Sequence, residues 1–165
     1  MKRMEVTEKQ IGENTFYLRP FPAFTAANIS GELAALITPM ISGLAPIFGG
    51  KSMDQVMDME MEDALPALSD AFSSLSGDKV ERLMKKLLID HKNISVDNPE
   101  TGKTEVLNLD LANEVFCGDV QDMFLLCFEV IKINFSGFFK KLGAQFGDLR
   151  GLLKKEAPST ESTEN

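Results

Sequence analysis

Two short stretches near the start of the chain have strand-like patterns. They are Met4 to Lys9 and Phe16 to Arg19, and they lie on either side of Gly12-Glu13-Asn14. These three residues tolerate the positive φ that tight turns need. The pattern therefore predicts an opening β-hairpin.

From Ala23 onward, apolar residues recur at helical spacing, with small residues between them. The recurring positions are Phe24, Leu33, Leu36, Ile37, Met40, Ile41 and Leu44. Thr38-Pro39 has the form of an N-cap followed by a proline in the first helical turn. The sequence predicts either two helices or one helix kinked at this point, with a break at Gly49-Gly50.

Residues 53–63 combine five carboxylates with four methionines and contain no basic residue. We expect a flexible loop or a frayed helix here. Methionine side chains repack around differently shaped neighbours, so Met57 and Met61 are candidate contacts of a surface that adapts to partners. A disordered connector explains the segment equally well.

Two further helices are predicted, over Ala64 to Leu75 and from Asp78 to about Leu88. Asp78 with Glu81 three positions later is typical of a capping box. The second helix has a clear apolar side, formed by Val80, Leu83, Met84, Leu87 and Leu88.

A second short hairpin is predicted near residues 93–109. Ile94 and Val96 precede, and Val106 and Leu109 follow, a run of turn-forming residues from Asp97 to Lys103.

The last third of the chain predicts three helices and a disordered tail. A short helix covers residues 110–116, and the strongly apolar segment Asp119 to Asn134 should lie at the centre of the core. A final helix from about Ser136 to Leu153 has a stripe formed by Phe135, Phe138, Phe139, Leu142, Phe146, Leu149 and Leu153. Residues 156–165 are polar and lack an apolar anchor.

These elements predict an α+β fold that is predominantly helical, with about six helices and two hairpins. A chain of 165 residues, 44% of them hydrophobic, can bury one continuous core. We therefore expect a single domain over residues 1–155.

A net charge of −8 opposes binding to phosphate backbones, so nucleic acid is not an expected partner. No stretch reaches the roughly 18 apolar residues that span a bilayer, and no signal peptide is recognisable at the start. We expect a cytoplasmic protein. Cys117 and Cys127 both lie in apolar helical patterns, where a reduced, buried thiol serves as a small hydrophobic side chain.

The inventory of reactive residues argues against an enzyme, a cofactor and a metal. His91 is the single histidine, and its place at a helix end is typical of a solvated cap. Ala45 to Ser52 ends like a phosphate-binding loop, but its first glycine is missing and a helix precedes it. The acidic residues of the 53–63 segment do not have the spacing of a calcium loop.

The final helix has binding character. Residues 132–155 carry six basic residues and a single acidic one in an otherwise acidic chain. Such a helix can pack on its own core, dock on a protein partner or a second copy, or lie on an anionic membrane. A membrane is not an expected partner of this chain.

Three stretches of the sequence resemble the tail assembly chaperones of tailed bacteriophages. They are the run from Phe16 to Phe24, the hairpin from Ile94 to Leu107, and the segment from Leu111 to Phe139. The resemblance is to chaperones of siphophage or myophage type, from a phage or prophage of a Gram-positive host. The acidic segment 53–63 has no place in this pattern.

The resemblance implies a non-enzymatic chaperone that binds the tape measure protein, keeps it soluble and assists the tail tube protein to polymerise around it. It also implies self-association, a longer frameshifted product in some members, and absence from the mature virion. The expected contact residues are Phe135, Phe138, Phe139, Leu142 and Phe146, with Met57 and Met61. The alternative is a structural tail component, such as a tube or completion protein, that stays in the virion.

Overall fold

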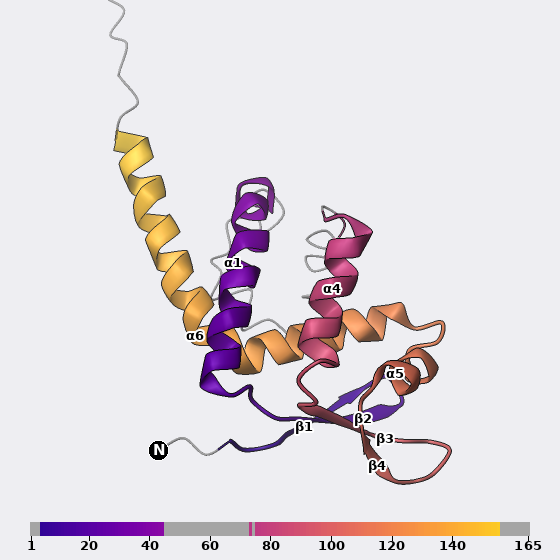
Figure 1. The fold of residues 1–165 in the computed structure, drawn as a ribbon. Helices are drawn as coiled ribbons and strands as arrows, with labels where there is room; N and C mark the ends of the chain where they lie inside the picture. The colour runs from indigo at the N-terminus through magenta and orange to yellow at the C-terminus, as the bar shows by residue number, and fades with distance from the viewer. Residues whose placement is uncertain (1–3, 45–72, 74, 156–165) are drawn as a thin grey trace, which may run out of the picture.

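The protein has an α+β fold in which helices lie on one side of an antiparallel sheet (Figure 1). The structure is a computed structural model that describes the backbone of residues 4–44, 73 and 75–155, and the side chains of residues 4–35, 73 and 75–137. The described elements are β1 (Thr7–Ile11), β2 (Asn14–Leu18), α1 (Ala23–Leu44), α4 (Gly77–Leu88), β3 (Ile94–Asp97), β4 (Thr104–Val106), α5 (Leu109–Val115) and α6 (Val120–Lys155).

Both predicted hairpins are present, with strand bounds shifted by a few residues. β1 and β2 pair from Thr7↔Leu18 to Ile11↔Asn14, so the first turn is tighter than the sequence suggested. Gly12 has a φ of 57°, a left-handed conformation that glycine adopts without steric cost. A Cβ at this position would lie 2.3 Å from a carboxylate oxygen of Asp122, so the turn also allows α6 to approach closely.

The two hairpins join into one sheet with the strand order β1-β2-β3-β4. β2 and β3 pair antiparallel, although more than seventy residues separate them in the sequence. The side chains on the helix-covered face of these central strands are completely buried, namely Phe16, Leu18, Ile94 and Val96. Local patterns predicted each hairpin, but not the pairing between them.

The opposite face of the sheet is polar. Tyr17 on β2 donates a hydrogen bond from its hydroxyl to Asp97 Oδ2 (3.1 Å), and Thr104 Oγ1 donates to Asp97 Oδ1 (2.6 Å). The bond to Asp97, and then partial desolvation and the nearby carboxylates, raise the pKa of Tyr17. The polar groups of three strands therefore satisfy one another without a second layer.

The described residues contain four helices, so the expectation of about six is wrong for this part of the chain. α1 continues across Thr38-Pro39, which favours the single-helix alternative. The helices expected at 119–134 and 136–153 form one element, α6. A glycine such as Gly137 costs only about 1 kcal/mol relative to alanine, too little to end a helix whose hydrogen bonds continue on both sides. The helix expected at 64–75 lies almost wholly outside the described residues.

α4 begins differently from the prediction. Its N-cap is Ser76, whose side chain makes no capping hydrogen bond, and Asp78 already lies in the first turn. Glu81 therefore does not complete a capping box. It instead pairs with Lys85 one turn later, and this contact lowers the pKa of Glu81. The predicted apolar side is confirmed, because Leu83, Met84, Leu87 and Leu88 are all buried.

The first half of α6 is the centre of the core, as the sequence predicted. Six consecutive residues, from Leu126 to Ile131, are buried. A helix buried around its whole circumference must be covered on all sides. The sheet, α1 and α4 supply this cover, and Phe116 after α5 stacks on Phe16 of β2 with ring centroids 5.7 Å apart.

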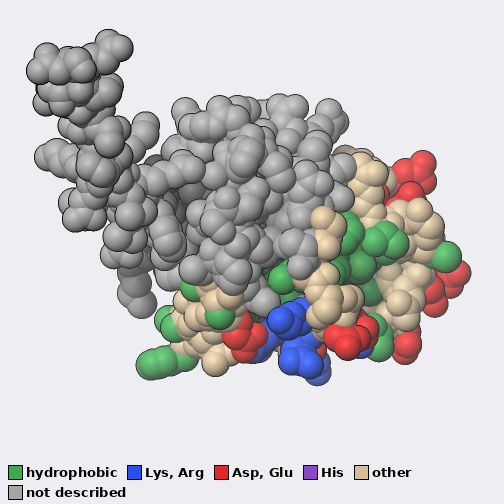
Figure 2. All heavy atoms as spheres, turned by 90° about the horizontal axis from the view of Figure 1, so that it is seen from above, with side chains coloured by type: hydrophobic (Ala, Val, Ile, Leu, Met, Phe, Trp, Pro, Cys, Tyr) green, Lys and Arg blue, Asp and Glu red, His purple; other side chains and the backbone are tan. Residues whose placement is uncertain are grey.

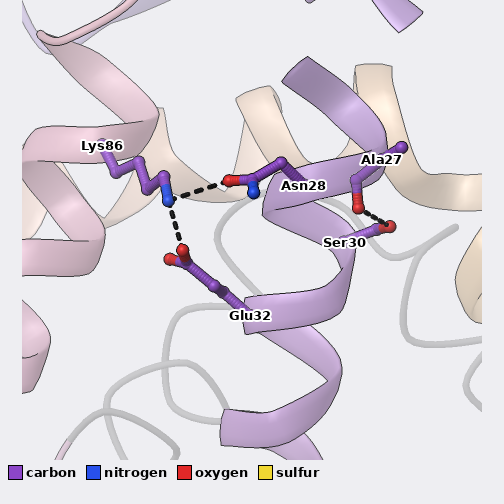
Figure 3. A network of polar contacts seen from close by, with 5 residues as sticks. All are labelled: Ala27, Asn28, Ser30, Glu32 and Lys86. Carbon is purple, nitrogen blue, oxygen red and sulfur yellow. Dashed lines mark hydrogen bonds and ion pairs between the residues drawn. The ribbon is translucent and has the colours of Figure 1, made fainter. Parts of the chain in front are cut away.

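α1 and α4 are connected by polar side chains on the outside of this core (Figure 3). Lys86 on α4 donates from Nζ to Asn28 Oδ1 on α1 (3.0 Å) and forms an ion pair with Glu32. Because these groups are partly exposed, we assign the contact a role in alignment rather than a large contribution to stability.

One charged residue lies inside the buried run of α6. Glu129 is 2% exposed, and its Oε2 lies 3.1 Å from Lys9 Nζ on β1. A buried carboxylate without a partner is costly, so this pair fixes the register of β1 against α6.

Replacement of Lys9 by methionine should lower the free energy of unfolding by about 2 to 4 kcal/mol, because it leaves Glu129 buried and unpaired. Combining Lys9→Met with Glu129→Leu should restore most of the loss. Urea unfolding of the two single variants and the double variant measures both effects. Equal stability of Lys9→Met and the native chain would contradict the importance of the pair.

The two cysteines should differ in reactivity. Cys117 is exposed, because it lies in the turn after α5, so the expectation that it is buried is wrong. Cys127 is fully buried, and its burial raises the pKa of the thiol. A thiol reagent at pH 8 should modify one cysteine per chain in the native protein and a second only in denaturant. The Cys117→Ser variant should show no rapid reaction in the native state, and rapid modification of Cys127 would argue against the placement of α6.

Candidate protein-binding surface

The sequence-predicted contact residues are not all in equivalent places. Phe135 is 2% exposed, and its ring lies 6.1 Å from that of Phe21, so it belongs to the core. The expectation that Phe135 is part of an exposed stripe is therefore wrong. The helical repeat placed Phe135 on an apolar face, but it could not show that the loop that follows β2 covers this residue.

The remaining candidates on α6 lie further along the helix. Phe138, Phe139, Leu142 and Phe146 belong to its last half, which extends away from the sheet in Figure 1. Only the backbone is described there. We refer to residues 138–155 as the α6 arm. Its sequence contains five basic residues and one acidic residue. Met57 and Met61 lie outside the described residues.

Phe24 is the most exposed large apolar residue among those described, at 94%. The sequence pattern grouped it with Leu33 at helical spacing, but the two residues differ in burial, since Leu33 is in the core. The buried positions of α1 include Ile29 and Leu33, one turn apart. Phe24 is five residues before Ile29, which at about 100° per residue places it roughly 140° away around the helix. The side chain of Phe24 therefore points away from the core in which Ile29 and Leu33 are buried.

The other exposed apolar side chains are distributed over several elements. They are Met4, Val6, Val106, Leu109 and Val120. Val120 belongs to the segment Asp119 to Asn134 that was expected at the centre of the core, but it is the first residue of α6 and lies at its exposed end. Figure 2 shows apolar side chains intermixed with acidic and basic ones on the described part of one face. Isolated apolar residues of this kind are common on protein surfaces.

The loop after β2 connects three parts of the molecule. Phe21 is buried and its ring packs against that of Phe135. The ring of His91 lies edge-on to the Phe21 ring, with the two ring centroids 5.5 Å apart. The backbone N–H of Phe21 donates to Asn134 Oδ1 on α6 (2.7 Å). His91, expected to be a solvated cap, is indeed exposed, but it also covers Phe21.

Sequence reasoning did not identify Asn134 as important. An available signal was its position, since asparagine is a poor residue for a helix interior and this one follows a strongly apolar run.

Among the described residues, no group of three or more His, Cys, Asp or Glu side chains is arranged to hold a metal ion. None of the helices in the described ranges combines the length and apolar character needed to cross a membrane. The segment Ala45 to Ser52, which has some likeness to a phosphate-binding loop, lies outside those ranges.

Comparison with known proteins gives one match. The model of a family described as "Phage tail assembly chaperone protein, TAC" matches residues 12–147. The match includes β2, β3 and β4 but not β1, which ends just before it, and it includes α6 as far as the middle of the arm. Searches of curated proteins and of solved structures found no match.

Phe21 and Phe24 form a matched pair for testing the surface. Phe21→Ala should lower the free energy of unfolding by about 3 to 5 kcal/mol, because it removes a buried ring. Phe24→Ala should change it by less than about 0.5 kcal/mol, since its ring is in solvent. Thermal or urea unfolding of both variants provides the comparison. A large loss for Phe24→Ala would mean that this ring is covered in the folded monomer.

Proposed function

Because the chain belongs to the phage tail assembly chaperone family, we propose that it binds the tape measure protein, keeps it soluble and assists the tail tube protein to polymerise around it. The role of a chaperone is not enzymatic. The observation that carries the proposal beyond the family is the α6 arm, a continuous helix that leaves the body and whose sequence is rich in phenylalanine and leucine.

The chemistry of the arm suits a helical partner. A tape measure protein is long and helical, as the family resemblance implies, and its apolar stripes would aggregate before the tube covers them. An amphipathic helix can cover such a stripe by packing its own apolar face along it. In this proposal Phe138, Phe139, Leu142 and Phe146 supply the apolar contacts, and the basic residues of the arm remain at the edge.

Reversibility follows from the same arrangement. The chaperone must leave when tube subunits replace it, so its affinity has to come from several modest contacts. A single helix offers a short row of apolar side chains and no enclosed pocket, which favours moderate affinity over very tight binding. Met57 and Met61 would add adaptable contacts, and self-association would place several arms along one tape.

We further propose that the protein acts in the host cytoplasm and is absent from the finished virion. Mass spectrometry of purified virions distinguishes this role from that of a retained tube or completion protein. A chaperone should be missing, whereas a structural component should be present in many copies.

Co-expression with the tape measure protein should raise the soluble fraction of that protein. The double variant Phe138→Asp, Phe139→Asp should lose most of this effect, because it places two charges on the proposed contact face. The measurement is the amount of soluble tape measure protein after centrifugation.

A matched control is the double variant Ala144→Asp, Gly151→Asp, which adds the same charge to the same helix at positions that, at about 100° per residue, lie opposite the proposed contacts. It should retain the effect. Protection of Cys127 from a thiol reagent checks that both variants fold. If the folded Phe138→Asp, Phe139→Asp protein solubilised its partner normally, the α6 arm would not be the contact surface.

A further inference from the structure

The segment between β2 and α1 is short of backbone hydrogen bonds. Arg19 N donates to the Asn93 carbonyl (2.9 Å) and extends the sheet by one residue, and the Pro22 carbonyl accepts from Ala26 N (2.9 Å) at the start of α1. Between them, Pro20 and Pro22 have no N–H. Phe21 therefore has the single backbone donor of the Pro20–Pro22 segment, and this donor points to α6.

Asn134 supplies the acceptor. Its Oδ1 accepts from Phe21 N at 2.7 Å, while its Nδ2 donates to the Val130 carbonyl of the preceding turn at 2.8 Å. The second bond fixes the orientation of the amide, so that the oxygen and not the nitrogen faces Phe21. Both ends of the side chain are thus used, which explains a poor helix former at this position.

The contact lies where α6 leaves the body. Phe135, the next residue, is the last fully buried side chain among those described in α6, and it packs against the Phe21 ring. Ser136 and Gly137 follow, and a serine-glycine pair is a common place for a helix to bend. In Figure 1 the later part of α6 has a different direction from the part that lies along the sheet.

From these contacts we infer that Asn134 is a positioning residue, which sets the direction of the α6 arm relative to the start of α1. Phe21 is held between two prolines and is three residues before Phe24. The same hydrogen bond therefore couples the beginning of α1 to the base of the arm.

This role rests on the proposed function in one respect, because the direction of the arm matters for capture only if the arm contacts the partner. Without the Asn134 bond, Phe21 N–H would lose its protein acceptor and the base of the arm would lose a fixed point. The arm would then sample a wider range of directions, although the core formed by Leu126 to Ile131 remains in place.

The test is a distance measurement in the full-length protein. Spin labels are attached to the native Cys117, which is exposed on the body, and to a cysteine introduced by Gln145→Cys in the arm, while the buried Cys127 stays unlabelled. Pulsed electron resonance gives the distribution of distances between the labels. It is measured for the native Asn134 and for Asn134→Leu, Asn134→Ala and Asn134→Asp.

Asn134→Asp keeps an oxygen that can accept from Phe21 N–H but loses the Nδ2 donor to the Val130 carbonyl, so its distribution should lie closer to that of the native residue than those of the other two variants. Asn134→Leu and Asn134→Ala remove the acceptor, and their distributions should be displaced or at least twice as wide. Far-ultraviolet circular dichroism and protection of Cys127 confirm folding. If either folded variant without the acceptor kept the native distribution, Asn134 would not position the arm.

Solubilisation of the tape measure protein gives the second readout. It should fall at least threefold for Asn134→Leu and by a smaller factor for Asn134→Asp. A wider distribution with undiminished solubilisation would support the positioning of the arm but overturn its proposed contact with the partner. These two results separate failure of the inference from failure of the proposed function.

Discussion

The fold depends on the burial of the first half of α6. The run from Leu126 to Ile131 has no exposed side, and the sheet, α1 and α4 each cover part of it. Burial on this scale is the main favourable contribution to folding, at about 25 cal/mol for each Å² of apolar surface removed from water. Glu129 adds a constraint to this apolar contact. Its carboxylate can pair with Lys9 only when β1 lies in one position along α6, so the ion pair selects one register of β1.

Local patterns predicted much of this architecture. α4, α5, the central part of α6 and both hairpins are present, since each has its own periodicity or turn chemistry. The pairing of β2 with β3 was not predictable from the same signals, because it joins segments far apart in the sequence. The number of helices in the described part of the chain was also wrong, because residues 119–134 and 136–153 were interpreted as two helices where α6 is continuous.

The candidate surface was harder to predict than the fold. Helical spacing assigned both Phe24 and Phe135 to apolar faces, but one is in solvent and the other is inside the core. Periodicity gives the angle between two residues around a helix axis. It does not show which other element, if any, packs against each side of the helix. Asn134 was missed for a related reason, since the backbone N–H that its side chain binds is over a hundred residues away in the sequence. The family resemblance, by contrast, is confirmed by the match over residues 12–147.

The position of the central helix near the end of the chain has a consequence for biosynthesis. The strands β1 and β2 are made before α6, and the side chains that cover Phe16 and Leu18 belong to segments made much later. Contacts between such distant segments form slowly, because the intervening chain must first be closed into a loop. On a translating ribosome, the apolar face of the first hairpin therefore remains exposed to solvent until the chain has been synthesised through Phe135. A protein of this design is itself exposed to aggregation during its own synthesis.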